Sequence, residues 1–69
     1  MAVFTSSALT LRKKMIIAAL REAGATDPAS AKALPETNLE NPAMFQEYTE
    51  QLVALNVIRK TPDGKYFLE

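Results

Sequence analysis

The side chains able to do chemistry are few in this sequence of 69 residues, because it contains neither cysteine nor histidine. Nucleophilic catalysis needs a nucleophile beside a base that activates it, and the residue types present do not supply such a pair. Zinc and related metals are bound chiefly through cysteine and histidine, so carboxylates alone would have to hold them. The sequence therefore predicts no enzymatic activity, no metal site and no bound cofactor.

Charged side chains are the remaining means of recognising a partner, and they are balanced in number, with eight basic and eight acidic residues. They are unevenly placed along the chain. Residues 26–56 hold five acids against the single base Lys32, which gives this stretch a net charge of minus four. The bases lie on both sides of it: Arg12, Lys13, Lys14 and Arg21 before it, and Arg59, Lys60 and Lys65 after it. Contact with phosphate groups is therefore expected only at the two basic ends.

Length and composition indicate one globular domain spanning residues 1–69. Apolar residues make up 48% of the chain and charged residues 23%, a balance typical of chains that fold. The apolar run of residues 15–20 ends at Arg21 and is too short to span a membrane, so we expect a cytoplasmic protein without membrane contact. A core of this size is only marginally stable, which keeps a homodimer open as an alternative.

The first element expected to position these charges is a helix over residues 7–23, preceded by a flexible lead at residues 1–6. Ile16 and Leu20 belong to an apolar stripe with helical spacing. Gly24 follows the last apolar residue of the stripe, where a left-handed cap requires a residue without Cβ.

Two further helices are expected from repeated start signals. Asp27-Pro28 begins a short helix that ends before Pro35, and Asn41-Pro42 begins a longer one over residues 42–55. The apolar face of the longer helix, predicted to be core, carries Phe45, Tyr48, Leu52 and Leu55. Its opposite, exposed face carries Ala43, Gln46, Glu47, Glu50 and Ala54.

Residues 57–68 predict a β-hairpin. The sequence Pro62-Asp63-Gly64 suits a type I turn closed by a glycine in the left-handed bulge position. With a three-residue loop, Lys60 faces Tyr66 across the ribbon, and Tyr66 shares one side with Ile58. We expect this side to cover the helices, because a lone hairpin is only marginally stable in water.

From about residue 8 to residue 68 the chain resembles the winged-helix branch of the helix-turn-helix superfamily. The segments that carry the resemblance are Leu20–Thr26, the Asp27-Pro28 start, Leu52–Lys60 and Asp63–Leu68. The resemblance implies a mainly α domain, a winged helix-turn-helix of three helices with a C-terminal β-hairpin as its wing. It also implies that the third helix enters the major groove of DNA while the wing touches the backbone.

The function that follows from this resemblance is nucleic-acid binding, as in a small transcriptional regulator that relies on a basic wing. The candidate contacts are Arg59, Lys60, Lys65, Gln46, Lys14 and Arg21. The exposed face of the third helix bears two acids and no base, which does not favour contact with phosphate groups.

This charge distribution leaves a second function open, a protein-interaction module of the same fold. Its partner face would be Gln46, Glu47 and Glu50, which suit a basic protein surface. Leu11 and Met15 lie off the main stripe of the first helix, and if exposed they form an apolar strip through which two copies pair. DNA, a protein partner and a second copy are thus the three candidate partners.

Overall fold

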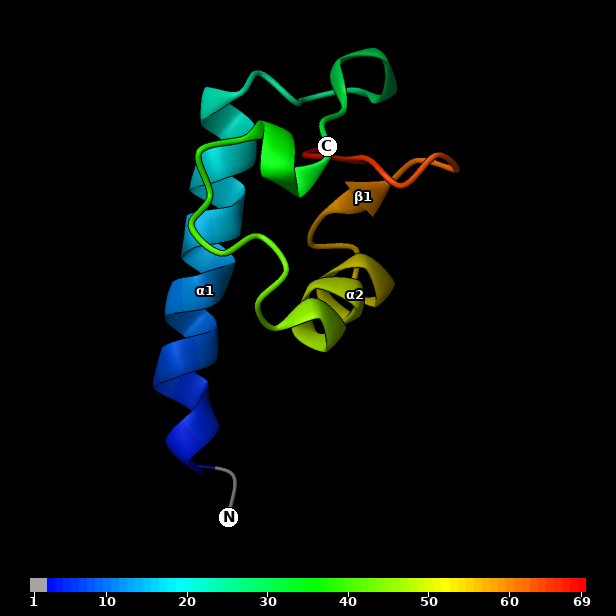
Figure 1. Ribbon diagram of the computed structural model, residues 1–69. Coiled ribbons are helices and arrows are strands. Elements are labelled where there is room, and N and C mark those ends of the chain that lie inside the picture. The colour runs from blue at the N-terminus through cyan, green and yellow to red at the C-terminus, as the bar shows by residue number, and fades with distance from the viewer. Residues whose placement is uncertain (1–2) are drawn as a thin grey trace.

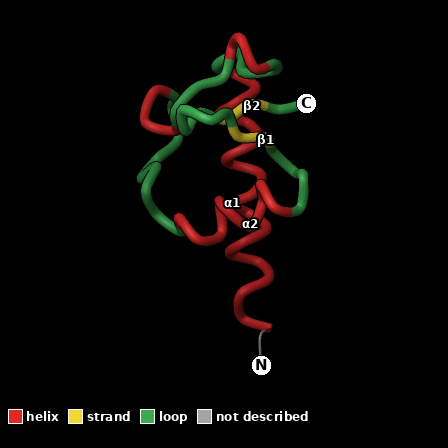
Figure 2. Tube along the Cα trace, turned by 90° about the vertical axis from the view of Figure 1, so that its right-hand side faces the viewer, coloured by secondary structure: helices red, strands yellow, loops and turns green. Residues whose placement is uncertain are grey.

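The computed structural model describes the backbone of residues 3–69 and the side chains of residues 9–69. Its elements, in chain order, are helix α1 (Val3–Glu22), the single 3-10 turns η1 (Pro28–Ser30) and η2 (Leu34–Glu36), helix α2 (Gln46–Ala54), and strands β1 (Arg59–Lys60) and β2 (Tyr66–Phe67). In Figure 1, α2 and the hairpin lie on one side of α1. The first turns of α1 extend beyond the other elements, and the view from the side in Figure 2 shows the same extension.

Helix α1 ends as its sequence predicts. Gly24 adopts a left-handed φ of 76°, and the amide of Ala25 donates to the carbonyl of Leu20 at 2.9 Å, the arrangement of a Schellman cap. The start of α1 differs from the expectation, because the helix already includes residues 3–6 of the predicted lead. Residues 1 and 2 of that lead lie outside the described residues.

The core fills the angle between α1, α2 and the hairpin. Ile16 and Leu20 of α1, Leu52 of α2 and Ile58 before β1 are almost wholly buried. The complete cluster of buried side chains is Ile16, Ala19, Leu20, Ala25, Leu34, Leu39, Leu52, Ile58 and Tyr66. Helices α1 and α2, the turn η2 and strand β2 each contribute to this cluster, as do the segments between them. Burial of apolar surface therefore holds these short elements together.

The hairpin forms with the predicted register. Lys60 pairs with Tyr66 and Arg59 with Phe67 in antiparallel fashion, and Gly64 takes a φ of 85° in the turn. On its other side, β2 is bridged by Lys32, whose amide donates to the Tyr66 carbonyl at 2.9 Å and whose carbonyl accepts from the Tyr66 amide at 2.8 Å. The hairpin is therefore stabilised by backbone pairing with the segment that follows η1.

The predicted winged helix-turn-helix with three helices is wrong. Within residues 3–69 the chain forms two α-helices and a two-stranded hairpin. The segment predicted as a short second helix divides into η1, an extended stretch around Lys32, and η2. Ala31 and Ala33 have ψ angles of 146°, because the backbone between them pairs with β2. The alanine-rich helix propensity of this segment is overridden by tertiary pairing.

The predicted third helix is shorter than the range 42–55. It begins at Gln46, because Phe45 adopts a left-handed φ of 57° that no helix can include. Phe45 is 46% exposed and Leu55 is 67% exposed, so the predicted core row is wrong at both ends. Leu52 is buried and Tyr48 packs partly against the core, as expected. Asn56 stops the helix in the left-handed conformation predicted for it, with a φ of 63°.

We predict that Ile58→Ala lowers the free energy of unfolding by about 2–5 kcal/mol, since it removes a fully buried side chain from a core with few others. Leu55→Ala is the matched control, because Leu55 is the most exposed large apolar side chain among residues 9–69. We expect it to change stability by less than about 0.5 kcal/mol. Urea unfolding followed by circular dichroism measures both variants, and similar losses in the two would contradict this core.

Candidate functional site

Arg12 occupies a core position in α1 although it is charged. It lies one turn before Ile16 on the buried stripe and is only 2% exposed. Its Nη1 donates to the carbonyl oxygen of Glu40 at 3.0 Å, and its Nη2 donates to the carbonyls of Asn41 at 2.9 Å and Met44 at 3.0 Å. Burial lowers the pKa of Arg12 from its ordinary value, but a guanidinium stays charged in proteins. Carbonyl dipoles of one loop therefore compensate the buried charge.

The loop that Arg12 holds has an unusual backbone conformation. Asn41 and Phe45 both have left-handed φ angles, of 49° and 57°. Asparagine tolerates this region, whereas a bulky residue such as phenylalanine costs on the order of 1–3 kcal/mol there. The carbonyl of Phe45 accepts the amide of Thr49 at 3.0 Å, which fixes the loop to the start of α2. Arg12 at one end and α2 at the other thus hold Phe45 in a strained conformation.

A groove lies where this loop meets α1. We call it the Arg12 groove; it has a volume of about 220 Å³ and is lined by Leu11, Arg12, Met15, Glu40, Asn41, Met44 and Phe45. Residues 9–69 hold four exposed large apolar side chains, and three of them line this groove: Leu11 at 59%, Met44 at 43% and Phe45 at 46%. The clustering of such side chains on a small domain is typical of an interaction surface.

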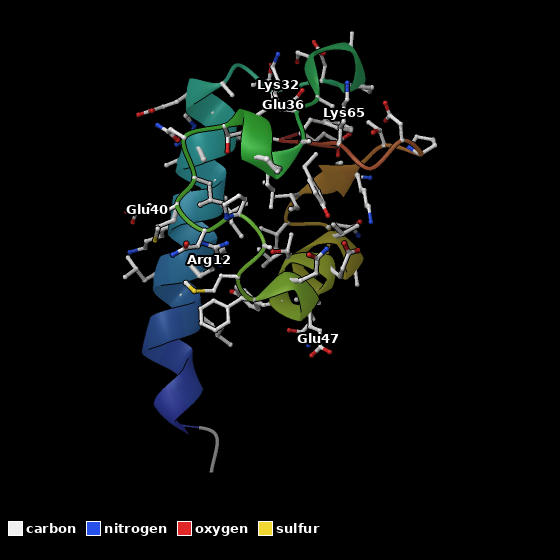
Figure 3. The ribbon with its side chains drawn as sticks, viewed as in Figure 1. Arg12, Lys32, Glu36, Glu40, Glu47 and Lys65 are labelled. Atoms are coloured by element: carbon white, nitrogen blue, oxygen red, sulfur yellow. The ribbon has the colours of Figure 1, made fainter. Side chains whose placement is uncertain are left out.

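Acidic side chains border the groove. Glu40 and Glu47 are exposed, and Figure 3 shows them on opposite sides of Arg12, with Glu40 at the outer side of α1 and Glu47 at the lower edge of α2. Lys14 is exposed on the neighbouring face of α1, one turn after Leu11. The groove is therefore lined mainly by apolar side chains and by Glu40, while Glu47 is exposed on the first turn of α2 and Lys14 is close by on α1.

The three bases predicted for the wing are brought together on the hairpin, but each has a carboxylate partner. Arg59 forms an ion pair with Glu69. Lys60 Nζ lies 3.0 Å from the Glu50 carboxylate, and Lys65 Nζ lies 4.0 Å from that of Asp63. These partners reduce the positive charge that the hairpin presents to a phosphate backbone.

The remaining predicted nucleic-acid contacts lie apart from the hairpin. Lys14 and Arg21 are exposed on α1, about half a turn around the helix from buried Arg12 and Ile16. They thus point away from the core against which the hairpin packs. Gln46 is exposed at the first residue of α2. The structure does not unite the six predicted contacts into one basic surface.

The predicted acidic face of α2 is divided. Glu50 accepts hydrogen bonds from Lys60 Nζ at 3.0 Å and from the Tyr66 hydroxyl at 2.9 Å. The bond from Lys60, and then that from Tyr66, lower the pKa of Glu50, while burial and the contact with Glu50 raise the pKa of Tyr66. Glu50 therefore ties α2 to the hairpin, and Gln46 and Glu47 are left exposed beside Phe45.

Comparison with known proteins adds no identification, because no protein-family model, curated protein or solved structure matches the chain. Within the described residues, no three side chains of the acidic, histidine or cysteine types come together to hold a metal ion. None of the described helices combines the length and the apolar character that crossing a membrane needs. The Arg12 groove is thus the feature on which a functional proposal can be based.

Sequence reasoning missed two residues that build this groove. Arg12 belongs by charge with the other bases of the first helix, yet it precedes Ile16 by four residues and Leu20 by eight, the spacing of the buried stripe. That spacing was the signal for its burial. Phe45 follows the same apolar period as Leu52 in the sequence, so no local signal marks its left-handed conformation.

We predict that Arg12→Met loosens the loop at residues 40–45, since three carbonyls lose their donor while the volume of the side chain is roughly kept. Losing hydrogen bonds to a charged donor should lower stability by about 1–3 kcal/mol. Hydrogen exchange read by mass spectrometry should show faster exchange in this loop and little change in the hairpin. Arg21→Met, at an exposed position of the same helix, is the control; unchanged loop exchange in Arg12→Met would refute the role of Arg12.

We predict that Glu50→Gln weakens the dependence of stability on acid pH. The pKa of Glu50 is lower in the folded protein than in the unfolded chain, so its contribution is present above the ordinary glutamate pKa of about 4.3. That contribution is lost as the pH falls through the lower, folded-state pKa. Urea unfolding across acid pH should therefore give a shallower decline for Glu50→Gln than for the wild type.

The control for this pH series is Glu47→Gln, which changes an exposed carboxylate on the same helix. It should keep the wild-type slope. Part of the slope persists in every variant, because hydrogen bonds also lower the pKa values of Asp27, through Ser30, and of Asp63, through Thr61. An identical decline in the Glu50 and Glu47 variants would show that the contact with Lys60 and Tyr66 contributes nothing.

Proposed function

We propose that this chain is a protein-interaction module that binds its partner in the Arg12 groove. The observation that carries the proposal is the gathering of Leu11, Met44 and Phe45 around a loop that a buried arginine holds in place. Methionine and aromatic residues are enriched in protein interfaces, and methionine adapts its shape to a partner. A rigid loop loses little conformational entropy on binding, which favours affinity.

The backbone strain at Phe45 supports the same conclusion. A phenylalanine in the left-handed region costs free energy that glycine or asparagine would not cost. Phe45 is nevertheless 46% exposed. Packing of its ring within the chain therefore offsets little of this strain. A partner that covers Phe45 would bury this exposed aromatic surface, which accounts for its position outside the core.

The edges of the groove indicate a partner that carries positive charge beside an apolar strip. Glu40 lines the groove, and Glu47 is exposed on the first turn of α2, two residues after Phe45. Carboxylates at the rim of an interface favour a basic partner in orientation and in association rate. Gln46 and Glu47, from the acidic face predicted to bind a protein, lie next to Phe45 and extend this rim. DNA binding draws less support, because the hairpin bases have carboxylate partners.

The test is a selection of random peptides displayed on phage, with the protein immobilised sparsely through its C-terminus. We predict enrichment of peptides that combine large apolar residues with lysine or arginine. Phe45→Asn should weaken a selected peptide by roughly tenfold or more, since burying an aromatic anchor contributes well over 1 kcal/mol. Asparagine is chosen because it tolerates the left-handed conformation, so the loop keeps its backbone.

Leu55→Asn is the matched control, because Leu55 is exposed on α2 and does not line the groove. It should leave peptide binding unchanged. Fluorescence titration of the wild type with mixed-sequence duplex DNA at low salt is the second arm. No enriched peptide together with saturable DNA binding would overturn the proposal, as would peptides that respond equally to both asparagine variants.

A further inference from the structure

We propose that the partner in the Arg12 groove is a second copy of this chain, whose α1 lies parallel to the first. This inference rests on the proposed function and names the partner of that site. Leu11, Met15 and Ala18 are spaced four and three residues apart, which is the heptad spacing of a helix that packs along another helix. In the sequence, Ala8 and Phe4 continue the same spacing toward the N-terminus. We call Leu11, Met15 and Ala18 the α1 seam.

The α1 seam is open to a second helix. Leu11 and Ala18 are exposed and Met15 is half-buried. Leu11 and Met15 also form one wall of the Arg12 groove, so a helix that packs on the seam covers the groove as well. The small Ala18 permits close approach of the two helices. The turns of α1 that extend beyond the other elements in Figures 1 and 2 lengthen the surface available for such pairing.

Charges flank the α1 seam in a fixed order. Lys14 immediately precedes Met15, and Arg21 follows Lys14 by seven residues. Residues seven apart lie on the same side of the helix, so these two bases flank one side of the α1 seam, which we call the basic edge. Glu40 marks the acidic edge, because it lines a depression with Met15 and Ala18 on the side where the loop crosses α1. Glu22 takes the heptad position that follows Ala18. The Asn38 side chain donates to the Glu22 carboxylate at 2.7 Å and holds this carboxylate toward the loop.

The order of these charges selects the orientation of the pair. A two-fold axis parallel to α1 places the basic edge of each copy opposite the acidic edge of the other. A two-fold axis perpendicular to α1 places bases against bases and acids against acids. Opposite charges attract across an interface and like charges exclude the wrong arrangement, so the parallel pair is favoured.

The charges also match in height along α1. The carbonyl of Glu40 accepts a hydrogen bond from Arg12, which puts Glu40 within a turn of Lys14. The parallel pair therefore forms a contact of Lys14 with Glu40 across the interface, which occurs twice by symmetry.

Engineered disulfides test the orientation directly, because the chain has no cysteine of its own. In a parallel pair every heptad position meets its counterpart, so Leu11→Cys and Ala18→Cys should both give disulfide-linked dimers under mild oxidation. Thr10→Cys, which is exposed on α1 but off the seam, should not. Cross-linking at only one of the two seam positions, or at neither, would overturn the parallel pair.

Charge reversal tests the pairing in the natural sequence, without engineered cysteines. Sedimentation equilibrium should show a wild-type dimer, and Lys14→Glu should weaken its dissociation constant by roughly tenfold, since two attractive contacts become repulsive. Adding Glu40→Lys to Lys14→Glu should restore the dimer. Lys32→Glu makes the same change in net charge away from α1 and should have no effect. A dimer that does not respond to Lys14→Glu would refute this arrangement.

The result for the pair and the result for the proposed function can be separated. A chain that is monomeric at every concentration, but binds selected peptides through Phe45, refutes the second copy and keeps the function. A chain that neither pairs nor binds peptides refutes both. Restored pairing in the double charge variant, together with weakening of the dimer by Phe45→Asn, supports both.

Discussion

The interaction on which this structure depends is the contact between the buried Arg12 guanidinium and three carbonyls of one loop. A charge placed in a small core is costly unless it is compensated, and here backbone dipoles supply the compensation. The contact joins residues 28 to 32 positions apart in the sequence. It fixes where the loop crosses α1 and where α2 can begin. The position of Phe45, and with it the groove, follows from this one side chain.

A competition between local preference and long-range pairing decides the rest of the fold. The alanine-rich segment 28–34 favours a helix by composition, but its centre at Lys32 pairs with Tyr66 of the hairpin. The extended segment gains two backbone hydrogen bonds to β2 and the burial of Ala31 and Leu34. This stabilisation exceeds that of a two-turn helix bounded by Pro28 and Pro35. A helix that short is marginal without packing. Pairing with the hairpin therefore replaces the helix that a winged-helix fold would need.

The features that could be predicted from the sequence are those that depend on residues adjacent in the chain. The cap at Gly24, the stop at Asn56 and the register of the hairpin depend on the conformational range of a few adjacent residues, and all three were predicted correctly. The burial of Arg12 and the exposure of Phe45 depend on a contact between the two halves of the chain. Helical spacing marks Arg12 as a core position, but only the contact with the loop compensates the charge that is buried there. The same periodicity predicts Phe45 in the core, where the structure does not place it.

A chain this small nevertheless keeps a charged residue, Arg12, in its core. Removing Arg12 would leave three carbonyls of the loop without their donor, so the guanidinium and the loop conformation stabilise each other. A guanidinium donates to several carbonyls at fixed angles, which an apolar side chain cannot do, and it thereby fixes a single loop conformation. The loop so fixed holds Phe45 in strain and leaves apolar surface open next to the α1 seam. Strain and open apolar surface both oppose the stability of an isolated chain with a core this small. Burial of that surface by the proposed partner would reverse the second of these costs, so in the proposed function folding and recognition depend on the same few side chains.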